Sequence, residues 1–262
     1  MTDRSFTSSA TATSRELDGI RVLVTGATSG LGAAMATALA GAGARVMVTS
    51  RDSRRAEASA SALGAAAIPG QLDVRDESSV VACVDRAYEA WGGIDVLVNN
   101  AGIGMRTVNP RFVSDPQPFW EVPPAGFRDV VETKIVGCFQ MARAVVPRML
   151  EGGGGRVVNI SMNEQTMVRR GFAPYGPAGA GVEALSRVMA ADLAGSSVTV
   201  NILLPGGATR TGMLPDDLPA EFRATLLEPT VMGPPIVWLA SDQAAGVHDL
   251  RVVANEFDPD AQ

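Results

Sequence analysis

The stretch Thr25-Gly26-Ala27-Thr28-Ser29-Gly30-Leu31-Gly32 decides the fold of this chain. An apolar run at 20–24 precedes it, and a helix-length segment at 30–42 follows at once. Glycines in such a turn let the backbone approach a phosphate closely, and the N-terminus of a helix favours negative charge. A tight turn without a ligand is the alternative. The context favours a phosphate site made of Gly26, Thr28, Ser29, Gly30, Leu31 and Gly32.

The same alternation of apolar runs and helical segments continues along the chain. Further apolar runs lie at 45–48, 66–74, 94–98, 156–160, 198–204 and 251–254, with helix-length segments at 53–63, 77–91, 125–150, 175–194 and 236–241. Several runs are continuously apolar, which is typical of strands buried on both faces. The pattern predicts one α/β domain over 17–262, with a Rossmann-like, doubly wound parallel sheet of seven strands. Residues 1–16 are Ser/Thr-rich and are predicted to be a disordered tail.

Composition excludes several classes of protein. The chain has 262 residues, 22 Lys+Arg against 28 Asp+Glu, and a net charge of −6, which argues against nucleic-acid binding. No apolar run approaches the roughly 20 residues of a membrane helix, so a membrane partner is not expected. Two cysteines make no disulfide framework, and one histidine makes a His-based metal site improbable. We expect a cytoplasmic protein with no metal.

Two long connections, 103–125 and 206–235, leave strands at the carboxyl edge of the predicted sheet. Ligands bind at this edge in open parallel sheets. The connections are rich in proline and large apolar residues, and they are interpreted as lids over a small-molecule substrate. Variable surface loops are the alternative.

The glycine spacing G-x-x-x-G-x-G resembles that of the short-chain dehydrogenase/reductase family. Asp73-Val74, Asn99-Asn100-Ala101-Gly102, Pro205-Gly206 and Tyr175 stand where that family has its other motifs, so the resemblance covers about residues 17 to 257. It implies the strand order 3-2-1-4-5-6-7, a dinucleotide cofactor and a homodimer or homotetramer. It places Asp73 at the adenine and Asn99 beside the adenosine ribose, with Thr209 or Thr211 at the nicotinamide carboxamide. The remaining implied cofactor residues are Val74, Ala101, Gly102, Pro205 and Gly206.

The end of the second strand bears on which cofactor binds. It reads Val48-Thr49-Ser50-Arg51, and no acidic side chain follows before Asp52 to hold the ribose hydroxyls of NAD. Ser50 and Arg51 suit a 2′-phosphate, since arginine makes bidentate phosphate contacts. The sequence therefore favours NADP(H) over NAD(H). A solvated basic turn is the alternative.

The catalytic positions depart from the family pattern. The resemblance implies an Asn-Ser-Tyr-Lys set, and this chain keeps Tyr175 as the acid or base. Gly179 stands in the place of the lysine, Met162 in that of the serine and Lys134 in that of the asparagine. Ser161 could orient the substrate only if the loop spacing differs. A tyrosine without the lysine has a pKa of about 10, so reduction, which needs a proton donor, is favoured over oxidation.

Lys134 lies on an apolar helical stripe with Val131, Cys138 and Met141, which predicts that it faces inward and has a lowered pKa. We hypothesise that its ammonium reaches the space vacated at Gly179 and partly replaces the missing lysine. Snorkelling to solvent is the alternative.

The loop before Tyr175 carries Arg169 and Arg170, either of which could bind an acidic substrate group. A solvated loop is the alternative. The sequence thus predicts an NADP(H)-dependent oxidoreductase that reduces a carbonyl compound. The alternative is a dinucleotide-fold protein without redox activity, either a lyase- or cyclase-type enzyme or a cofactor-binding partner protein.

Overall fold

The computed structural model describes residues 16–216 and 218–261. Within them the strands form one seven-stranded sheet in the order β3-β2-β1-β4-β5-β6-β7, and every pairing is parallel. The predicted fold class and strand order are confirmed. Residues 1–15 of the predicted tail lie outside the described residues. The strands are β1 (Arg21–Val24), β2 (Arg45–Ser50), β3 (Ala67–Gln71), β4 (Val96–Asn99), β5 (Gly155–Ile160), β6 (Val198–Leu204) and β7 (Arg251–Val253).

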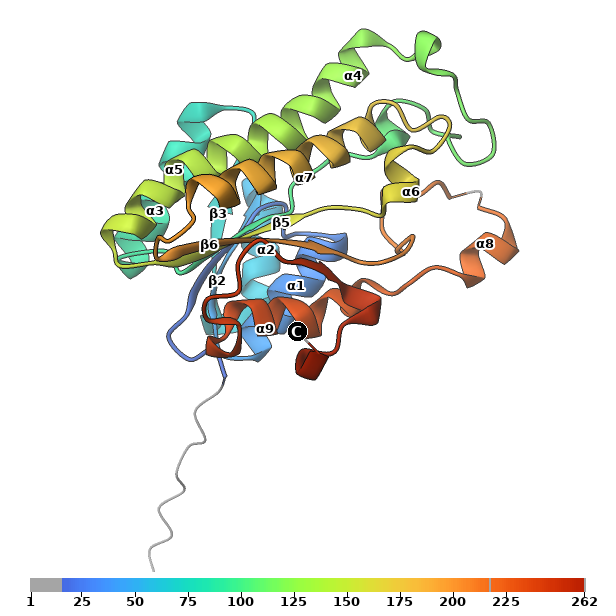
Figure 1. The fold of residues 1–262 in the computed structure, drawn as a ribbon. Coiled ribbons are helices and arrows are strands. Elements are labelled where there is room, and N and C mark those ends of the chain that lie inside the picture. The colour runs from blue at the N-terminus through green and yellow to red at the C-terminus, as the bar shows by residue number, and fades with distance from the viewer. Residues whose placement is uncertain (1–15, 217, 262) are drawn as a thin grey trace, which may run out of the picture.

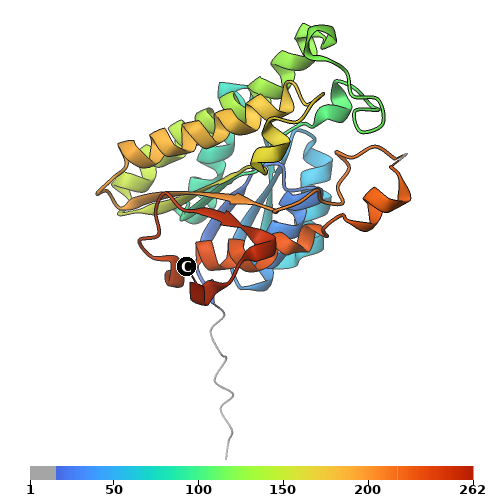
Figure 2. The same cartoon turned by 45° about the vertical axis from the view of Figure 1, so that its right-hand side comes forward.

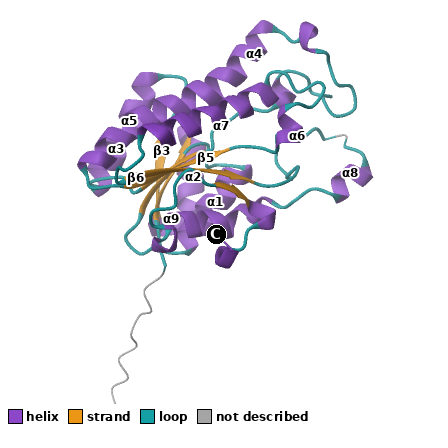
Figure 3. Ribbon diagram, in the orientation of Figure 1, coloured by secondary structure: helices purple, strands orange, loops and turns teal. Residues whose placement is uncertain are grey.

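Helices cover both faces of this sheet (Figures 1 and 3). One face carries α1 (Gly30–Gly41), α2 (Ser53–Leu63) and α9 (Gly233–Ala240), and the other carries α3 (Glu77–Trp91), α5 (Gly137–Glu151) and α7 (Tyr175–Asp192). The shorter helices are α4 (Pro124–Val131), α6 (Glu164–Met167) and α8 (Ala220–Ala224). None of the helices in the described residues is long and apolar enough to cross a membrane.

The sheet is buried on both faces because successive strand residues point to opposite sides. In β1, Val22 and Val24 join the core with α1 and α9, while Leu23 joins the core with α3 and α5. Each of these three side chains is fully buried. Two packed faces explain why the strands are continuously apolar in sequence.

The long helix predicted at 125–150 is divided by a π-helical turn, Glu132–Val136, between α4 and α5. A π turn inserts one residue into the helical repeat, and such turns are frequent at functional sites. Lys134 is the central residue of this turn. The 3.6-residue period cannot show such an insertion, so the π turn was not predicted.

Two boundaries differ from the prediction by three residues. Helix α9 begins at Gly233 rather than 236, because Pro234 and Pro235 occupy its first turn, where proline's missing N–H costs nothing. Strand β3 ends at Gln71, which leaves Asp73 and Val74 in the connection that follows. Both long connections leave the sheet at the same end (Figure 2).

Candidate active site

A cavity of about 660 Å³ lies at the carboxyl ends of the strands. Its wall extends from the glycine-rich turn to Tyr175 and includes parts of both long connections, so both lie at the cavity as predicted. Their role as lids stays a prediction. The predicted residues in this wall are Gly26, Thr28, Ser29, Gly30, Leu31, Ser50, Arg51, Asp73, Val74, Ala101, Gly102, Lys134, Ser161, Tyr175, Pro205, Thr209 and Thr211. The volume is typical of a small-molecule or cofactor site.

The glycine-rich turn is held tightly against β4. A Cβ atom at Gly32 would lie 2.3 Å from the carbonyl oxygen of Gly26 and 2.4 Å from Asn100 Nδ2. Asn100 Nδ2 donates to the carbonyls of Thr25 at 2.9 Å and Gly26 at 3.1 Å. Gly32 therefore allows the close packing of the turn against Asn100, and it does not line the cavity itself. The turn opens α1 with no acidic residue in the first helical turn, so it fits a phosphate group.

Asn99 is not where the resemblance placed it. Its side chain is buried and Nδ2 donates to Asn159 Oδ1 at 2.9 Å, away from the large cavity. Neighbouring residues of a strand point to opposite faces, so Asn100 lines the cavity instead. The prediction that Asn99 lies beside the adenosine ribose is wrong for this side chain. Sequence reasoning gave Asn100 no role, although an amide that follows a buried strand at the carboxyl edge is a usable signal.

Charged residues that follow β2 and β3 define the local charge at this edge of the sheet. Asp52 accepts from the backbone N–H groups of Arg54 and Arg55 at 2.9 and 3.3 Å, so its carboxylate caps α2. Arg51 and Arg55 line the cavity, whereas Arg54 and Asp52 do not. Asp73 also lines it, and the Arg75 guanidinium at 2.9 Å holds the pKa of the Asp73 carboxyl below its usual range.

The segment after β6 closes the cavity over the turn. Thr211 lies against Gly30, since a Cβ atom there would meet Thr211 Cγ2 at 3.1 Å. Thr209 donates its hydroxyl to the carbonyl of Gly207 at 3.1 Å. Gly206 lies outside the wall, and its carbonyl accepts from Asn163 Nδ2 at 2.9 Å.

Tyr175 begins α7 and presents its hydroxyl to the cavity. Met213 Sδ is 3.9 Å from the hydroxyl oxygen. The ring packs against Phe172 with centroids 6.5 Å apart. Burial raises the pKa of the Tyr175 hydroxyl, so the phenol is protonated at neutral pH.

Lys134 faces inward, as predicted, and it is the sole lysine among the 262 residues. Its side chain is only 9% exposed, and Nζ lies 5.2 Å from the centre of the Tyr175 ring. A Cβ atom on Gly102 would lie 3.4 Å from the same Nζ. Within the described part of the chain no carboxylate pairs with this ammonium, and burial lowers its pKa to about 8. Snorkelling to solvent is thereby excluded.

The space at Gly179, however, is filled by Met162. A Cβ atom at Gly179 would lie 2.5 Å from Met162 Cε and 2.8 Å from its Sδ. Our hypothesis that the Lys134 ammonium occupies this space is therefore wrong, because a thioether already packs there. Lys134 approaches Tyr175 from the side of Gly102 instead.

Ser161 lines the cavity, but its hydroxyl hydrogen is already used. Ser161 Oγ donates to Glu183 Oε1 at 2.7 Å, and Glu183 in turn pairs with Arg251 at 3.0 Å. The serine is 6% exposed and belongs to this ionic cluster between β5, α7 and β7. The structure thus gives no support to Ser161 as the group that orients a substrate carbonyl.

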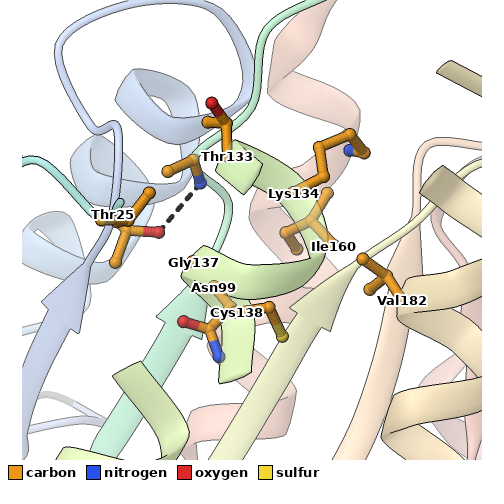
Figure 4. Close-up of a pocket in the computed structure, with 10 residues that line it drawn as sticks. Thr25, Asn99, Thr133, Lys134, Gly137, Cys138, Ile160 and Val182 are labelled. Carbon is orange, nitrogen blue, oxygen red and sulfur yellow. Dashed lines mark hydrogen bonds between the residues drawn. The ribbon is translucent and has the colours of Figure 1, made fainter. Parts of the chain in front are cut away.

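A second, much smaller cavity of about 10 Å³ lies under the π turn (Figure 4). Thr25, Asn99, Thr133, Lys134 and Cys138 are among its lining residues. Asn99 Oδ1 is buried there without a hydrogen-bond partner. The volume suits about one water molecule, which would satisfy that oxygen. Lys134 lines both cavities and so separates this buried polar space from Tyr175.

The fold and this cavity together define an α/β protein with a cofactor-sized site at the carboxyl edge of its sheet, the place where such sheets bind dinucleotides. Residues 21–221 match the family model described as short chain dehydrogenase. The chain belongs to the short-chain dehydrogenase/reductase family.

Relatives of known name are dehydrogenases and reductases, which makes this chain an enzyme of the oxidoreductase class. It is 36% identical over 236 residues to cis-4-hydroxycyclohexanecarboxylate dehydrogenase of Sinomonas cyclohexanicum, covering 86% of this chain and 90% of that protein. A crystal structure of 3-ketoacyl-(acyl-carrier-protein) reductase from Brucella melitensis, complexed with NADH, is 30% identical with a TM-score of 0.80, covering 90% and 96% of the two chains.

A gluconate 5-dehydrogenase from Burkholderia cenocepacia, in complex with NADP and tartrate, is 29% identical with a TM-score of 0.80, covering 91% and 94%. The relatives bind either nicotinamide dinucleotide, and the glycine-rich turn of this chain fits such a cofactor.

Proposed function

We propose that this protein is an NADP(H)-dependent reductase of a carbonyl compound and that Tyr175 donates the proton. One observation carries the proposal: the Tyr175 hydroxyl and the Lys134 ammonium face the same cavity as the glycine-rich turn. The named relatives, a hydroxycyclohexanecarboxylate dehydrogenase and a ketoacyl reductase, interconvert alcohols and carbonyls and support the same chemistry.

The residues of the cavity divide the work by position. The turn from Gly26 to Leu31 would hold the pyrophosphate, and Thr211, which lies over Gly30, would cover it. When bound, the nicotinamide supplies the hydride. The protonated Tyr175 gives its proton to the carbonyl oxygen as negative charge develops there.

Lys134 replaces the missing lysine from a different helix. A buried ammonium without a partner is costly, and hydroxyl oxygens of the nicotinamide ribose would satisfy it. Its position between Gly102 and the Tyr175 ring supports this role. An ammonium at that place also favours the negative charge left on Tyr175 after proton transfer.

The charge at the end of β2 supports NADP(H). Arg51 and Arg55 are in the wall, while the nearby carboxylate of Asp52 is engaged as a helix cap. A 2′-phosphate beside Arg51 would gain charge-assisted hydrogen bonds.

Titration with NADPH and NADH, followed by thermal shift, tests the proposal. At about 100 times the Kd, NADPH should add about 2.7 kcal/mol of stability. Arg51→Ala should weaken NADPH binding about 10- to 100-fold and leave NADH unchanged. Arg54→Ala is the matched control, because Arg54 shares the turn but not the wall. Equal binding of the two cofactors would contradict the assignment of Arg51.

The variant Lys134→Ala tests the proposed role of Lys134, in the same titration and in an assay of carbonyl reduction. We expect weaker NADPH binding together with a lower kcat for carbonyl reduction. Unchanged affinity and turnover would remove Lys134 from the site.

One observation favours a second candidate. Met162 and Gly179 fill the places of two family catalytic residues with an inert apolar contact. If neither cofactor binds, the redox proposal is refuted, and the second candidate is a non-redox enzyme with Tyr175 as its acid.

A further inference from the structure

We propose that Arg169 binds a carboxylate of the substrate, so that the carbonyl compound reduced at Tyr175 is an oxo-acid. This inference rests on the proposed reductase function and names its substrate class. In the bound substrate, an apolar section of the cavity would separate the carboxylate at Arg169 from the reacting carbonyl at Tyr175.

The charge balance of the cavity wall carries the first step. Among the described residues of the wall, Asp73 is the one acidic side chain, and it is paired with Arg75 close to Arg51. The wall near Tyr175 instead carries cations, Lys134, Arg106 and Arg169. A cavity with this imbalance selects anionic ligands.

Arg106 and Arg169 differ in what they contact. Arg106 pairs with Asp216 at 2.7 Å, so its charge is compensated. Arg169 makes no ion pair within the described part of the chain. If Lys134 holds the cofactor ribose, Arg169 is the cation left for the substrate.

Aromatic contacts hold the Arg169 guanidinium in place. Its Cζ lies 4.8 Å from the centre of the Phe172 ring. Phe172 packs edge-on against Phe112 at 5.4 Å and against Tyr175 at 6.5 Å. One ring therefore connects the cation to the proposed acid, and it supplies an apolar surface between them. The substrate thus needs an apolar body between its two polar ends.

The turn that carries Arg169 is fixed against the first long connection. The Phe172 N–H donates to the carbonyl of Arg169 at 3.1 Å. Gly171 has φ +78°, and a Cβ atom there would lie 2.6 Å from Pro116 Cβ. This close approach requires glycine and fixes the turn from which Arg169 reaches the cavity.

The neighbouring residue offers a contrast. Arg169 and Arg170 are both exposed, but Arg169 lines the cavity and Arg170 does not. Glu164, the nearest acid along the loop, is also outside the wall. The sequence left the choice between Arg169 and Arg170 open. The placement of the two side chains assigns the role to Arg169, whose planar guanidinium matches a carboxylate in two parallel hydrogen bonds.

Kinetics with a matched pair of ketones test the inference. The probes are 5-oxohexanoate and its methyl ester, which differ in the carboxylate alone. Arg169→Gln should lower kcat/KM for the acid about 10- to 100-fold and leave the ester unchanged. Arg170→Gln should change neither. An unchanged acid-to-ester ratio in Arg169→Gln, or an equal loss in Arg170→Gln, would overturn the assignment.

Calorimetric titration with hexanoate, which has no carbonyl, separates this inference from the reductase proposal. We expect wild type to bind hexanoate and Arg169→Gln to lose that binding. If hexanoate binding depends on Arg169 but neither ketone is reduced, the anion site stands and the reductase proposal is refuted. If the ketones are reduced but Arg169→Gln still binds hexanoate as wild type does, the reductase proposal stands and the anion site at Arg169 is refuted.

Discussion

At the scale of single residues, Met162 and Gly179 explain how this chain keeps its fold while departing from the family's catalytic set. The Met162 side chain is 6% exposed and lies against the bare Cα of Gly179. The Met162 side chain fills the space that the missing side chain of Gly179 leaves, so substitutions at the two positions should be coupled.

Restoring the lysine at position 179 alone should therefore destabilise the protein. Gly179→Lys places its Cβ atom 2.5 Å from Met162 Cε, and such overpacking costs about 1–3 kcal/mol of unfolding free energy. Adding Met162→Ser should recover that loss. Chemical denaturation of the two single variants and the double variant measures the coupling. Additive effects would show that the two side chains do not share this space.

The same scale shows what sequence reasoning could reach. The apolar stripe of its helix placed Lys134 inside correctly, because a helical period reports which face is buried. It could not show that Met162 takes the space at Gly179, since rotamers depend on packing. Asn99 was misplaced because one residue along a strand reverses the direction of a side chain. Ser161 lines the cavity, but the sequence could not show that Glu183 engages its hydroxyl.

At the scale of elements, the two long connections are joined by Arg106. Its guanidinium donates to the carbonyl of Leu214 at 3.2 Å and to Asp216 Oδ2 at 2.7 Å. Met213, the residue before Leu214, reaches the Tyr175 hydroxyl. We therefore expect the Met213 side chain to move when a substrate carbonyl approaches Tyr175.

Arg106→Gln should loosen this segment without unfolding the protein. The Arg106 and Asp216 side chains are 40% and 88% exposed, and a pair this exposed contributes less than about 1 kcal/mol. We expect faster hydrogen–deuterium exchange at 209–216 and a small change in Tm. Arg111→Gln, which breaks the exposed Arg111–Asp115 pair in the first connection, is the control. Equal exchange in the two variants would contradict the role of Arg106.

The sequence located both connections but not their contact. Proline content and length predict a loop, whereas an ion pair between residues 106 and 216 depends on how the sheet brings two strand ends together. The π turn was missed for a similar reason, since the packing of α4 and α5 selects it rather than the local sequence.

At the scale of the whole molecule, the fold class was predictable because it follows from strand–helix alternation, whereas the strand order was implied by the family resemblance. The homodimer or homotetramer implied by the resemblance stays a prediction. Phe139 on α5 and Val188 on α7 are 48% and 56% exposed, on neighbouring helices of one face (Figure 1).

Lys134 also affects the stability of the whole protein. Its pKa falls from 10.5 to about 8 on folding, so between these values the unfolded chain binds the extra proton. The buried charge destabilises the cofactor-free protein most below pH 8, and stability is regained as pH rises toward 10.5. Lys134→Met should raise the free energy of unfolding by about 3 kcal/mol at pH 7 and by about 2 kcal/mol at pH 9. Urea unfolding of wild type and variant at both pH values measures the difference. A pH-independent difference would show that folding does not lower the pKa of Lys134.

The fit of Met162 against Gly179 has a consequence for protein engineering. Lysine at position 179 alone meets the Met162 side chain, and serine at position 162 alone leaves a gap beside Gly179. The route to the family's serine and lysine therefore passes through a paired substitution, and neither single change is a stable halfway point.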